Sequence, residues 1–387
     1  MPTTPLRNIL YRLSLPFLAP GPGFSPELKI EGRPIVNAKA YSSLLRRHHV
    51  LGSACLLASK DKQSVILSSS SRPEHTARRG TMFRVASITK MAAALCALRL
   101  CDQGKLSLDE PVARYFPDER FPSTADTITL RQLLSHTSGL LDPPDFETRV
   151  VTGVPFPKTL TECPHTEPGK AFHYSNFGYG LIGCLFEAVT NKTVSQVLDE
   201  MVFQPLRMRA TLDPTTLNAN DIMPITRVLP WRKDQDVIIT NLGRVPLKSP
   251  DPLRHYGHTA GSMYTDIDSL AALLRCLMND GSPLISGDLG REARRVHAVY
   301  GALSPTLSYG LGLLIIQDPA LSSSRILGHQ GFAYGCADAA FWEEDTGRMI
   351  IFLNGGCSEA RSGRLGLCNR DILKLFLQKE FPRWEQK

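Results

Sequence analysis

A helix that is apolar on nearly every side places the strongest constraint on the fold of this chain. From Ser87 the sequence reads SITKMAAALCALRLCDQGKL, where Ala, Leu and Met dominate and Gly104 stands where a helix would end. A helix without a polar face has no side to turn to water, so we expect it to be buried. With 387 residues, 42% of them hydrophobic, the chain is long enough to build the core that such a helix needs.

The elements before and after this helix predict an α+β fold. Two strands precede it, at 51–59 and 64–70, and they follow a short helix that Asn37 can cap. Strand-like segments and a last amphipathic helix lie near the C-terminus, at 312–317, 325–329, 337–343, 349–353 and 369–381. We expect the two ends of the chain to build one antiparallel sheet flanked by helices, and the middle to form an all-helical lobe.

These patterns divide the chain into three parts. Residues 1–34 contain seven prolines, too many for a helix interior, and are expected to form a proline-rich arm on the surface. Residues 35–104 and 256–387 are assigned to a discontinuous α/β lobe, and residues 105–255 to the helical lobe, so that together they make one domain. We expect a small-molecule site in the cleft between the two lobes.

Basic charge is concentrated in the first quarter of the chain. The net charge is +7, from 44 Lys and Arg against 37 Asp and Glu; residues 1–100 hold 15 basic and 4 acidic side chains, a balance of +11 that leaves −4 for the rest. No interleaving of basic and aromatic residues accompanies this charge, so no nucleic-acid partner is expected. Arg78, Arg79 and Arg84 either bias the cleft toward anionic substrates or only keep this part of the chain soluble.

Cysteine spacing and hydropathy indicate which cellular compartment to expect. The nine cysteines show none of the paired spacings of zinc ribbons or disulfide-stapled modules, so reduced thiols are expected, and no metal or other cofactor is predicted. Arg12 and Pro16 interrupt the apolar run at 9–19, and no window reaches the roughly 18 to 20 apolar residues that span a bilayer. These features predict a soluble, cytoplasmic protein without a membrane segment; they leave its oligomeric state open.

Ser87 and Lys90 are three residues apart at the start of the apolar helix, so their side chains share one face. Burial favours the neutral form of a lysine, which can take a proton from a nearby hydroxyl and so activate a serine. The first turn of the helix also offers free backbone N–H groups to a developing oxyanion. Taken alone, the pair is better explained as a first-turn serine and a surface lysine.

Two further segments carry candidate residues. Tyr174 could shuttle protons, because a lysine ammonium beside it would favour its phenolate, and Asn176 could hold both Lys90 and a substrate amide. His329 ends a strand-like segment, where Gly331 would allow an extended substrate to approach closely. Taken alone, these residues fit ordinary turn chemistry and a structural histidine.

Together the segments resemble those of the serine β-lactamase and penicillin-binding-protein superfamily, in particular its class C β-lactamase-like branch of esterases, D-peptidases and acyltransferases. The likeness runs from about residue 36 to about residue 378. The matching stretches, in chain order, are FRVASITK, GKLSLDEPVARYFP, LLSHTSGL, PGKAFHYSNFGYGLIG, AGSMYTDIDSLAALL, YGLGLLI and GHQGF.

The resemblance implies a β-lactamase/transpeptidase-like fold with the active site in the cleft between the sheet lobe and the helical lobe. It implies Ser87 as the acylated nucleophile and Lys90 with Tyr174 as its general base system. Asn176 would contact the substrate and the lysine. Backbone N–H groups of Ser87 and Phe332 would form the oxyanion hole.

Two positions depart from the pattern of this superfamily. His329 stands where true β-lactamases carry the lysine of a Lys-Thr-Gly motif, and Gln330 stands where Thr or Ser is usual. Loss of a fixed cation weakens the case for binding the carboxylate of a penicillin. His329, Gly331 and Phe332 remain candidates for substrate binding.

We therefore predict a serine hydrolase that forms an acyl-enzyme at Ser87 and cleaves a small-molecule ester or amide, as an esterase or a D-amino acid peptidase or amidase does. The same acyl-enzyme could pass its acyl group to an amine or alcohol, which would make the protein an acyltransferase. A true β-lactamase and a non-catalytic penicillin-binding sensor module are weaker alternatives.

Other polar residues are expected to play no part in the chemistry. His48 and His49 are interpreted as a solvated helix end rather than a metal or phosphate site. Cys163 and His165 lack a third residue to orient them as a catalytic dyad. His136, within LLSHTSGL, is expected to pack beneath the site.

Overall fold

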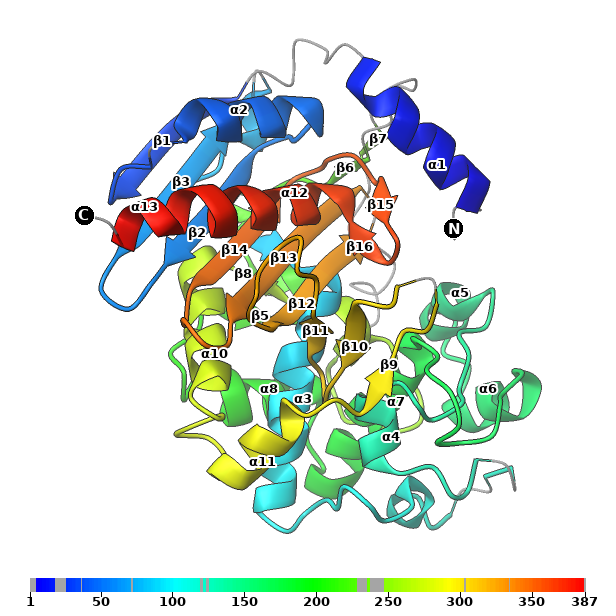
Figure 1. Ribbon diagram of the computed structural model, residues 1–387. Helices are drawn as coiled ribbons and strands as arrows, with labels where there is room; N and C mark the ends of the chain where they lie inside the picture. The colour runs from blue at the N-terminus through cyan, green and yellow to red at the C-terminus, as the bar shows by residue number, and fades with distance from the viewer. Residues whose placement is uncertain are drawn as a thin grey trace.

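A nine-stranded antiparallel sheet forms the centre of the molecule (Figure 1). The computed structural model describes residues 5–17, 26–35, 37–70, 72–118, 121–122, 125–227, 235–236, 247–302, 304–333 and 335–385. The strand order is β1-β3-β2-β14-β13-β12-β11-β10-β9, so strands from the two ends of the chain meet where β2 pairs with β14. The strands are β1 (Glu27–Gly32), β2 (Ser53–Ala58), β3 (Gln63–Ser69), β9 (Ala298–Val299), β10 (Leu307–Tyr309), β11 (Leu314–Ile316), β12 (Ile326–Ala333), β13 (Cys336–Glu343) and β14 (Met349–Asn354).

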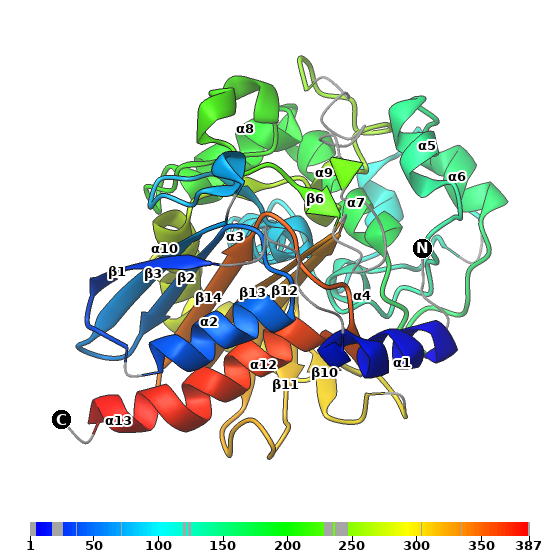
Figure 2. The same ribbon diagram turned by 90° about the horizontal axis from the view of Figure 1, so that it is seen from above.

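Helices cover both faces of this sheet, which is why β2, β13 and β14 are buried at every residue. On one face lie α2 (Ala38–Arg47), α12 (Leu367–Leu375) and α13 (Phe381–Glu385), as Figure 2 shows. On the other face lie α3 (Thr89–Asp102) and α10 (Ile267–Met278). Alternate residues of one strand serve the two cores: Leu57 packs in the core of the first face and Leu56 in the core of the second. The fold is therefore of the predicted α+β class.

The apolar helix is α3, and it is buried as predicted, since Thr89 to Leu98 are all inaccessible to water. Its second side packs against helices of the middle segment, α7 (Asn176–Thr190) and α8 (Val194–Leu198). The same segment contains α4 (Leu130–Leu134), α5 (Phe146–Val151) and α6 (Phe156–Glu162), and it is followed by α9 (His258–Gly261) and, after α10, by α11 (Gly287–Ala293). Two small sheets were not predicted: one consists of β4 (Phe83–Arg84), β5 (Ala210–Thr211) and β8 (Tyr264–Thr265), the other of β6 (Thr226–Arg227) and β7 (Gln235–Asp236).

Residues 1–34, expected to form a proline-rich arm on the surface, contain regular secondary structure in the parts that the structure describes. This segment contains helix α1 (Pro5–Ser14) and strand β1, which pairs with β3 at the edge of the central sheet. The prolines do not prevent either element. Pro5 is the first residue of α1, where its missing N–H costs nothing, and Pro16, Pro26 and Pro34 lie outside both elements.

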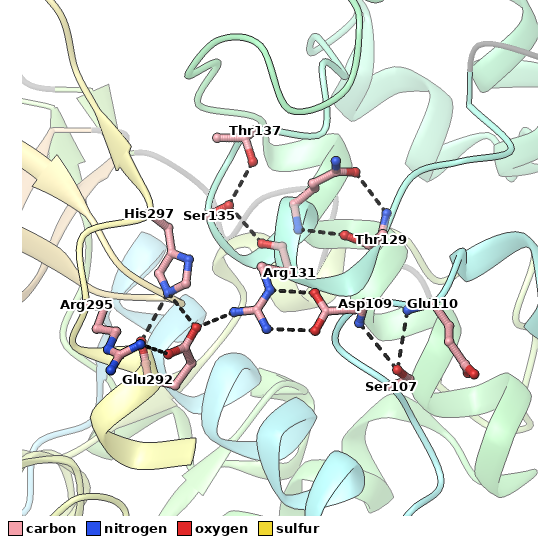
Figure 3. Close-up of polar contacts among 11 residues, drawn as sticks. Ser107, Asp109, Glu110, Thr129, Arg131, Ser135, Thr137, Glu292, Arg295 and His297 are labelled. Carbon is pink, nitrogen blue, oxygen red and sulfur yellow. Dashed lines mark hydrogen bonds and ion pairs between the residues drawn. The ribbon is translucent and has the colours of Figure 1, made fainter. Parts of the chain in front are cut away.

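A cluster of ion pairs fixes α4 relative to its neighbours (Figure 3). Arg131 on α4 forms a two-pronged pair with Asp109, with N···O distances of 2.6 and 2.8 Å, and a second pair with Glu292 on α11. Ser135, at the end of α4, donates a hydrogen bond of 2.8 Å to the Arg131 carbonyl. The chain that follows α4 is thereby anchored, and it carries His136 and Asp142 into the site.

Candidate active site

Ser87 lies in a tight turn directly before α3, and close backbone packing holds that turn. The preceding residue, Ala86, has a φ of +45°, a conformation that residues other than glycine rarely adopt. Strand β12 presses against the same segment, since a Cβ on Gly331 would lie 2.3 Å from the Val85 carbonyl oxygen. The close approach predicted for Gly331 therefore exists, but its partner is the backbone beside Ser87 rather than a substrate.

Lys90 is fully buried below Ser87. Its Nζ donates three hydrogen bonds, to Ser87 Oγ at 3.2 Å, to Asn176 Oδ1 at 2.9 Å and to the Ala260 carbonyl at 2.6 Å. Burial lowers the pKa of Lys90 to about 7, against the opposing effect of the Asp142 carboxylate and with a smaller contribution from Arg84. The neutral amine is therefore accessible near neutral pH, as the sequence led us to expect.

Asp142 determines how Asn176 faces the lysine. Asn176 begins α7, and its Nδ2 donates to Asp142 Oδ2 at 2.8 Å. A carboxylate only accepts, so the amide nitrogen must point to Asp142 and the amide oxygen to Lys90. Asp142 also accepts from the Phe177 backbone N–H at 2.9 Å, in the first turn of α7. Sequence reasoning missed Asp142; the signal was a carboxylate two residues after LLSHTSGL with no partner in its own segment.

Tyr174 lies beside Lys90, with Nζ 4.9 Å from the centre of its ring. Its pKa is raised because burial of the hydroxyl outweighs the hydrogen bond to Ser87, which acts in the opposite direction. The expectation that the lysine would favour the phenolate is therefore wrong. Tyr174 is a neutral phenol, which can give a proton as well as relay one.

His136 packs beneath Tyr174, with ring centres 4.2 Å apart, and its Nδ1 accepts a hydrogen bond of 3.1 Å from the Ser175 backbone. Burial lowers the pKa of His136 well below its usual value. The prediction of a packing role is confirmed.

His329 lies in the wall of the site, but it carries no charge. Its pKa is lowered to about 3 by burial, with a further contribution from Lys90. The Nδ1 atom lies 2.6 Å from the Gln330 carbonyl oxygen, so Nδ1 carries the proton and Nε2 accepts from the Tyr309 hydroxyl at 2.8 Å. This strand position therefore carries no fixed cation, unlike the lysine of true β-lactamases.

A cavity of about 360 Å³ opens above Ser87. Strand β12 continues past the last residue that pairs with β11, Gly328, so among the described residues 329–333 have no strand partner on that side. The cavity brings four predicted residues together, and Lys90, Asn176 and Gly331 lie behind its wall. Its lining is Ser87, Leu141, Phe172, His173, Tyr174, Tyr300, Leu314, His329, Gln330, Phe332, Arg361 and Arg364. Sequence reasoning missed both arginines.

The remaining candidates lie apart from this cavity. His48 and His49 are buried, so the prediction of a solvated helix end is wrong; His48 Nε2 lies 2.8 Å from Asp371 Oδ2. His165 Nδ1 contacts the backbone oxygen of Cys163 at 3.1 Å, and burial raises the pKa of the Cys163 thiol. Neither of these pairs is set up for catalysis.

Among the described residues, no helix combines the length and the apolar character needed to cross a membrane.

Comparison with known proteins identifies the family. Residues 38–354 match the family described as Beta-lactamase. Esterase EstB from Burkholderia gladioli is 27% identical over 341 residues, which cover 76% of this chain and 83% of the esterase.

Two solved structures share the fold. D-amino acid amidase from Ochrobactrum anthropi SV3, complexed with L-phenylalanine, superposes with a TM-score of 0.68 and 23% identity, covering 87% of this chain and 95% of the amidase. The octameric penicillin-binding protein homologue from Pyrococcus abyssi gives a TM-score of 0.69 and 18% identity, covering 88% and 77%. The chain belongs to the beta-lactamase family of serine hydrolases, as its sequence motifs predicted.

Proposed function

We propose that this protein is a serine esterase or amidase that forms an acyl-enzyme at Ser87 on a small-molecule substrate. The observation that carries the proposal is the environment of Lys90. Asn176 Oδ1 and the Ala260 carbonyl are acceptors only, so they engage two hydrogens of the lysine whether it is charged or neutral. In the neutral amine the third position, which faces Ser87 Oγ, is the lone pair. The lysine is thus oriented as a base for that hydroxyl.

Acylation begins when the neutral Lys90 takes the Ser87 proton and Oγ attacks the substrate carbonyl. Negative charge then develops on the carbonyl oxygen, where the backbone N–H groups of Ser87 and Phe332 can donate. One such donor is worth about 3 to 4 kcal/mol of barrier. Tyr174 lies between the lysine and the cavity, so as a neutral phenol it can protonate the departing alcohol or amine and recover its proton from the Lys90 ammonium.

Deacylation reverses these roles. A water molecule in the cavity gives a proton to the Tyr174 and Lys90 pair and attacks the acyl carbon. The carboxylic acid leaves, and Ser87 regains its proton. The related protein EstB is named as an esterase, which supports hydrolysis of this kind.

A fluorophosphonate probe tests the proposal directly, because it phosphonylates an activated serine. We expect wild type to gain one probe mass by intact-mass spectrometry and Ser87→Ala to gain none. Ser138→Ala is a control, since Ser138 is a buried serine that does not line the cavity. Equal labelling of wild type and Ser87→Ala would disprove the proposal.

The same intermediate allows acyl transfer if an amine or alcohol reaches it before water. Product analysis with and without candidate acceptors separates the two outcomes. An adduct that forms at Ser87 and never turns over would instead identify a sensor. Turnover of a chromogenic cephalosporin at the rate of simple esters would identify a β-lactamase, which the uncharged His329 does not favour.

A further inference from the structure

A short hairpin forms one wall of the cavity above Ser87. It consists of β15 (Arg361–Ser362) and β16 (Leu365–Gly366), which pair antiparallel around a turn at Gly363, where φ is +61°. Arg361 at its start and Arg364 at its turn both line the cavity. Two cations therefore face the space in which a substrate would lie.

Among the described residues, no carboxylate lies within ion-pair distance of Arg361 or Arg364. Glu359 attracts Arg361 electrostatically, but its ion pair, at 3.5 Å, is with Arg227. The Arg361 guanidinium lies over the Phe332 ring at 4.0 Å. A guanidinium stacked in this way keeps the N–H donors of its edge available, and their spacing matches a planar carboxylate.

The backbone of the hairpin is held from two sides by side-chain amides. Gln330 on β12 donates to the Arg364 carbonyl at 2.7 Å and accepts from the Gly366 N–H at 2.9 Å. Asn8 on α1 donates to the Arg361 carbonyl at 3.1 Å and accepts from the Arg361 N–H at 3.0 Å. Each side-chain amide thus bonds to the backbone of the hairpin as a neighbouring strand would. The backbone that carries both arginines is therefore fixed before any ligand binds, which lowers the entropic cost of binding.

We propose that this hairpin is a carboxylate subsite, in which Arg361 and Arg364 bind an anionic group of the substrate and α1 positions Arg361 through Asn8. The inference rests on the proposed function, because the cavity is the one above Ser87. It names the substrate class as a small ester or amide that carries a free carboxylate. The positive charge that His329 does not provide is thus supplied by a different element, the hairpin of β15 and β16.

Matched esters test the subsite. One pair, mono-4-nitrophenyl adipate and 4-nitrophenyl hexanoate, differs in a carboxylate on the acyl group. A second pair, 3-acetoxybenzoate and its methyl ester, differs in a carboxylate on the leaving group. We expect wild type to prefer the anionic member of at least one pair in kcat/KM, with a preference that falls as salt is added.

Substitution of the arginines tests whether they cause the preference for the anionic ester. We expect Arg361→Gln and Arg364→Gln each to lower the ratio of kcat/KM for the preferred anionic ester to kcat/KM for its neutral partner by about tenfold or more, mainly through the KM of the anionic ester. Arg383→Gln, an exposed cation on α13 that does not line the cavity, is the matched control and should change neither. Equal losses on both members of a pair, or no anionic preference in wild type, would overturn the subsite.

Asn8→Ala tests the positioning by α1. We expect it to reduce the anionic preference severalfold while neutral-ester turnover stays unchanged, whereas Leu13→Ala, which removes an exposed side chain from the same helix, should leave both unchanged. An unaltered preference in Asn8→Ala would remove α1 from the proposal. Fluorophosphonate labelling of every variant keeps the tests separate, since a failed subsite leaves labelling at Ser87 intact and a failed acyl-enzyme does not.

Discussion

The Asp142 carboxylate holds the side-chain amide of Asn176 at 2.8 Å and thereby turns the amide oxygen toward the buried lysine. The two residues come from different segments, the loop after α4 and the first turn of α7. The same carboxylate raises the pKa of Lys90 against the effect of burial. In the proposed mechanism Asp142 is thus a positioning residue, which acts on Lys90 directly through its charge and indirectly through Asn176.

Asp142→Asn should separate this role from a purely structural one. The neutral amide no longer raises the pKa of Lys90, so we expect the acidic limb of the kcat/KM profile to move to lower pH. An amide can also donate, which allows Asn176 to turn its nitrogen toward the lysine, and we expect kcat to fall about tenfold or more, with little change in KM. Asp145→Asn, in the exposed ion pair with Arg149, is the control. A fall in activity without a shift of the pH profile would contradict the electrostatic part of this role.

The pH dependence of the wild type follows from Lys90. In the proposed mechanism only the neutral amine accepts the Ser87 proton, and burial lowers the pKa of Lys90 to about 7. We therefore expect kcat/KM to rise with pH from 6 to 8 and to level off above that range. A profile that is flat through pH 7 would show that another group is the base.

The lowered pKa of Lys90 also makes the stability of the fold depend on pH. Burial lowers the pKa of Lys90 from 10.5 to about 7, so between these values the unfolded chain binds a proton that the folded protein does not. Stability should increase with pH across this window, by up to about 1.4 kcal/mol per pH unit from this group. Urea unfolding of Lys90→Met should lack this increase, and that of Lys105→Met, at an exposed lysine, should retain it. Equal slopes in wild type and Lys90→Met would contradict the assignment.

The sequence predicted the elements whose pattern is local. The apolar helix α3 and the hairpin of β2 and β3 follow from periodicity and turn residues. The predicted final helix is α12, which continues through a π-helical segment (Phe376–Glu380) into α13.

What the sequence could not predict depends on contacts between distant segments. β1 is a strand because β3 offers it an edge, and prolines next to it concealed that outcome. Asp142 and Arg361 became site residues only when the fold placed them beside residues remote in the chain. The pKa of Tyr174 was predicted in the wrong direction because a neighbouring charge can be guessed from motifs, whereas the loss of hydration depends on packing.

Gly331→Ala tests the packing of β12 against the segment that carries Ser87. The new Cβ would lie 2.3 Å from the Val85 carbonyl oxygen, which is backbone and cannot rotate away. We expect a loss of about 3 kcal/mol in the free energy of unfolding, measured with urea, and loss of most esterase activity. Gly80→Ala is the control, because the nearest atom to its Cβ is the flexible end of Arg209 at 3.4 Å. A stable and active Gly331→Ala protein would mean that β12 can move away from Ser87.

Gln330→Thr restores the residue type that β-lactamases favour and tests why this chain departs from it. Threonine is too short to reach both the Arg364 carbonyl and the Gly366 N–H, so two hydrogen bonds to the hairpin are lost. At about 1 kcal/mol each, their loss should cost roughly 2 kcal/mol of hairpin stability. Hydrogen exchange should therefore become faster at residues 361–366 and remain unchanged in β13 and β14, and the preference for anionic esters should fall.

Gln330→Glu retains the bond from Gly366 but repels the Arg364 carbonyl, so we expect an intermediate effect on exchange. Exchange in the hairpin that is equally fast in wild type and Gln330→Thr would show that Asn8 and Ser304, which accepts from the Arg364 N–H at 3.1 Å, hold it without Gln330.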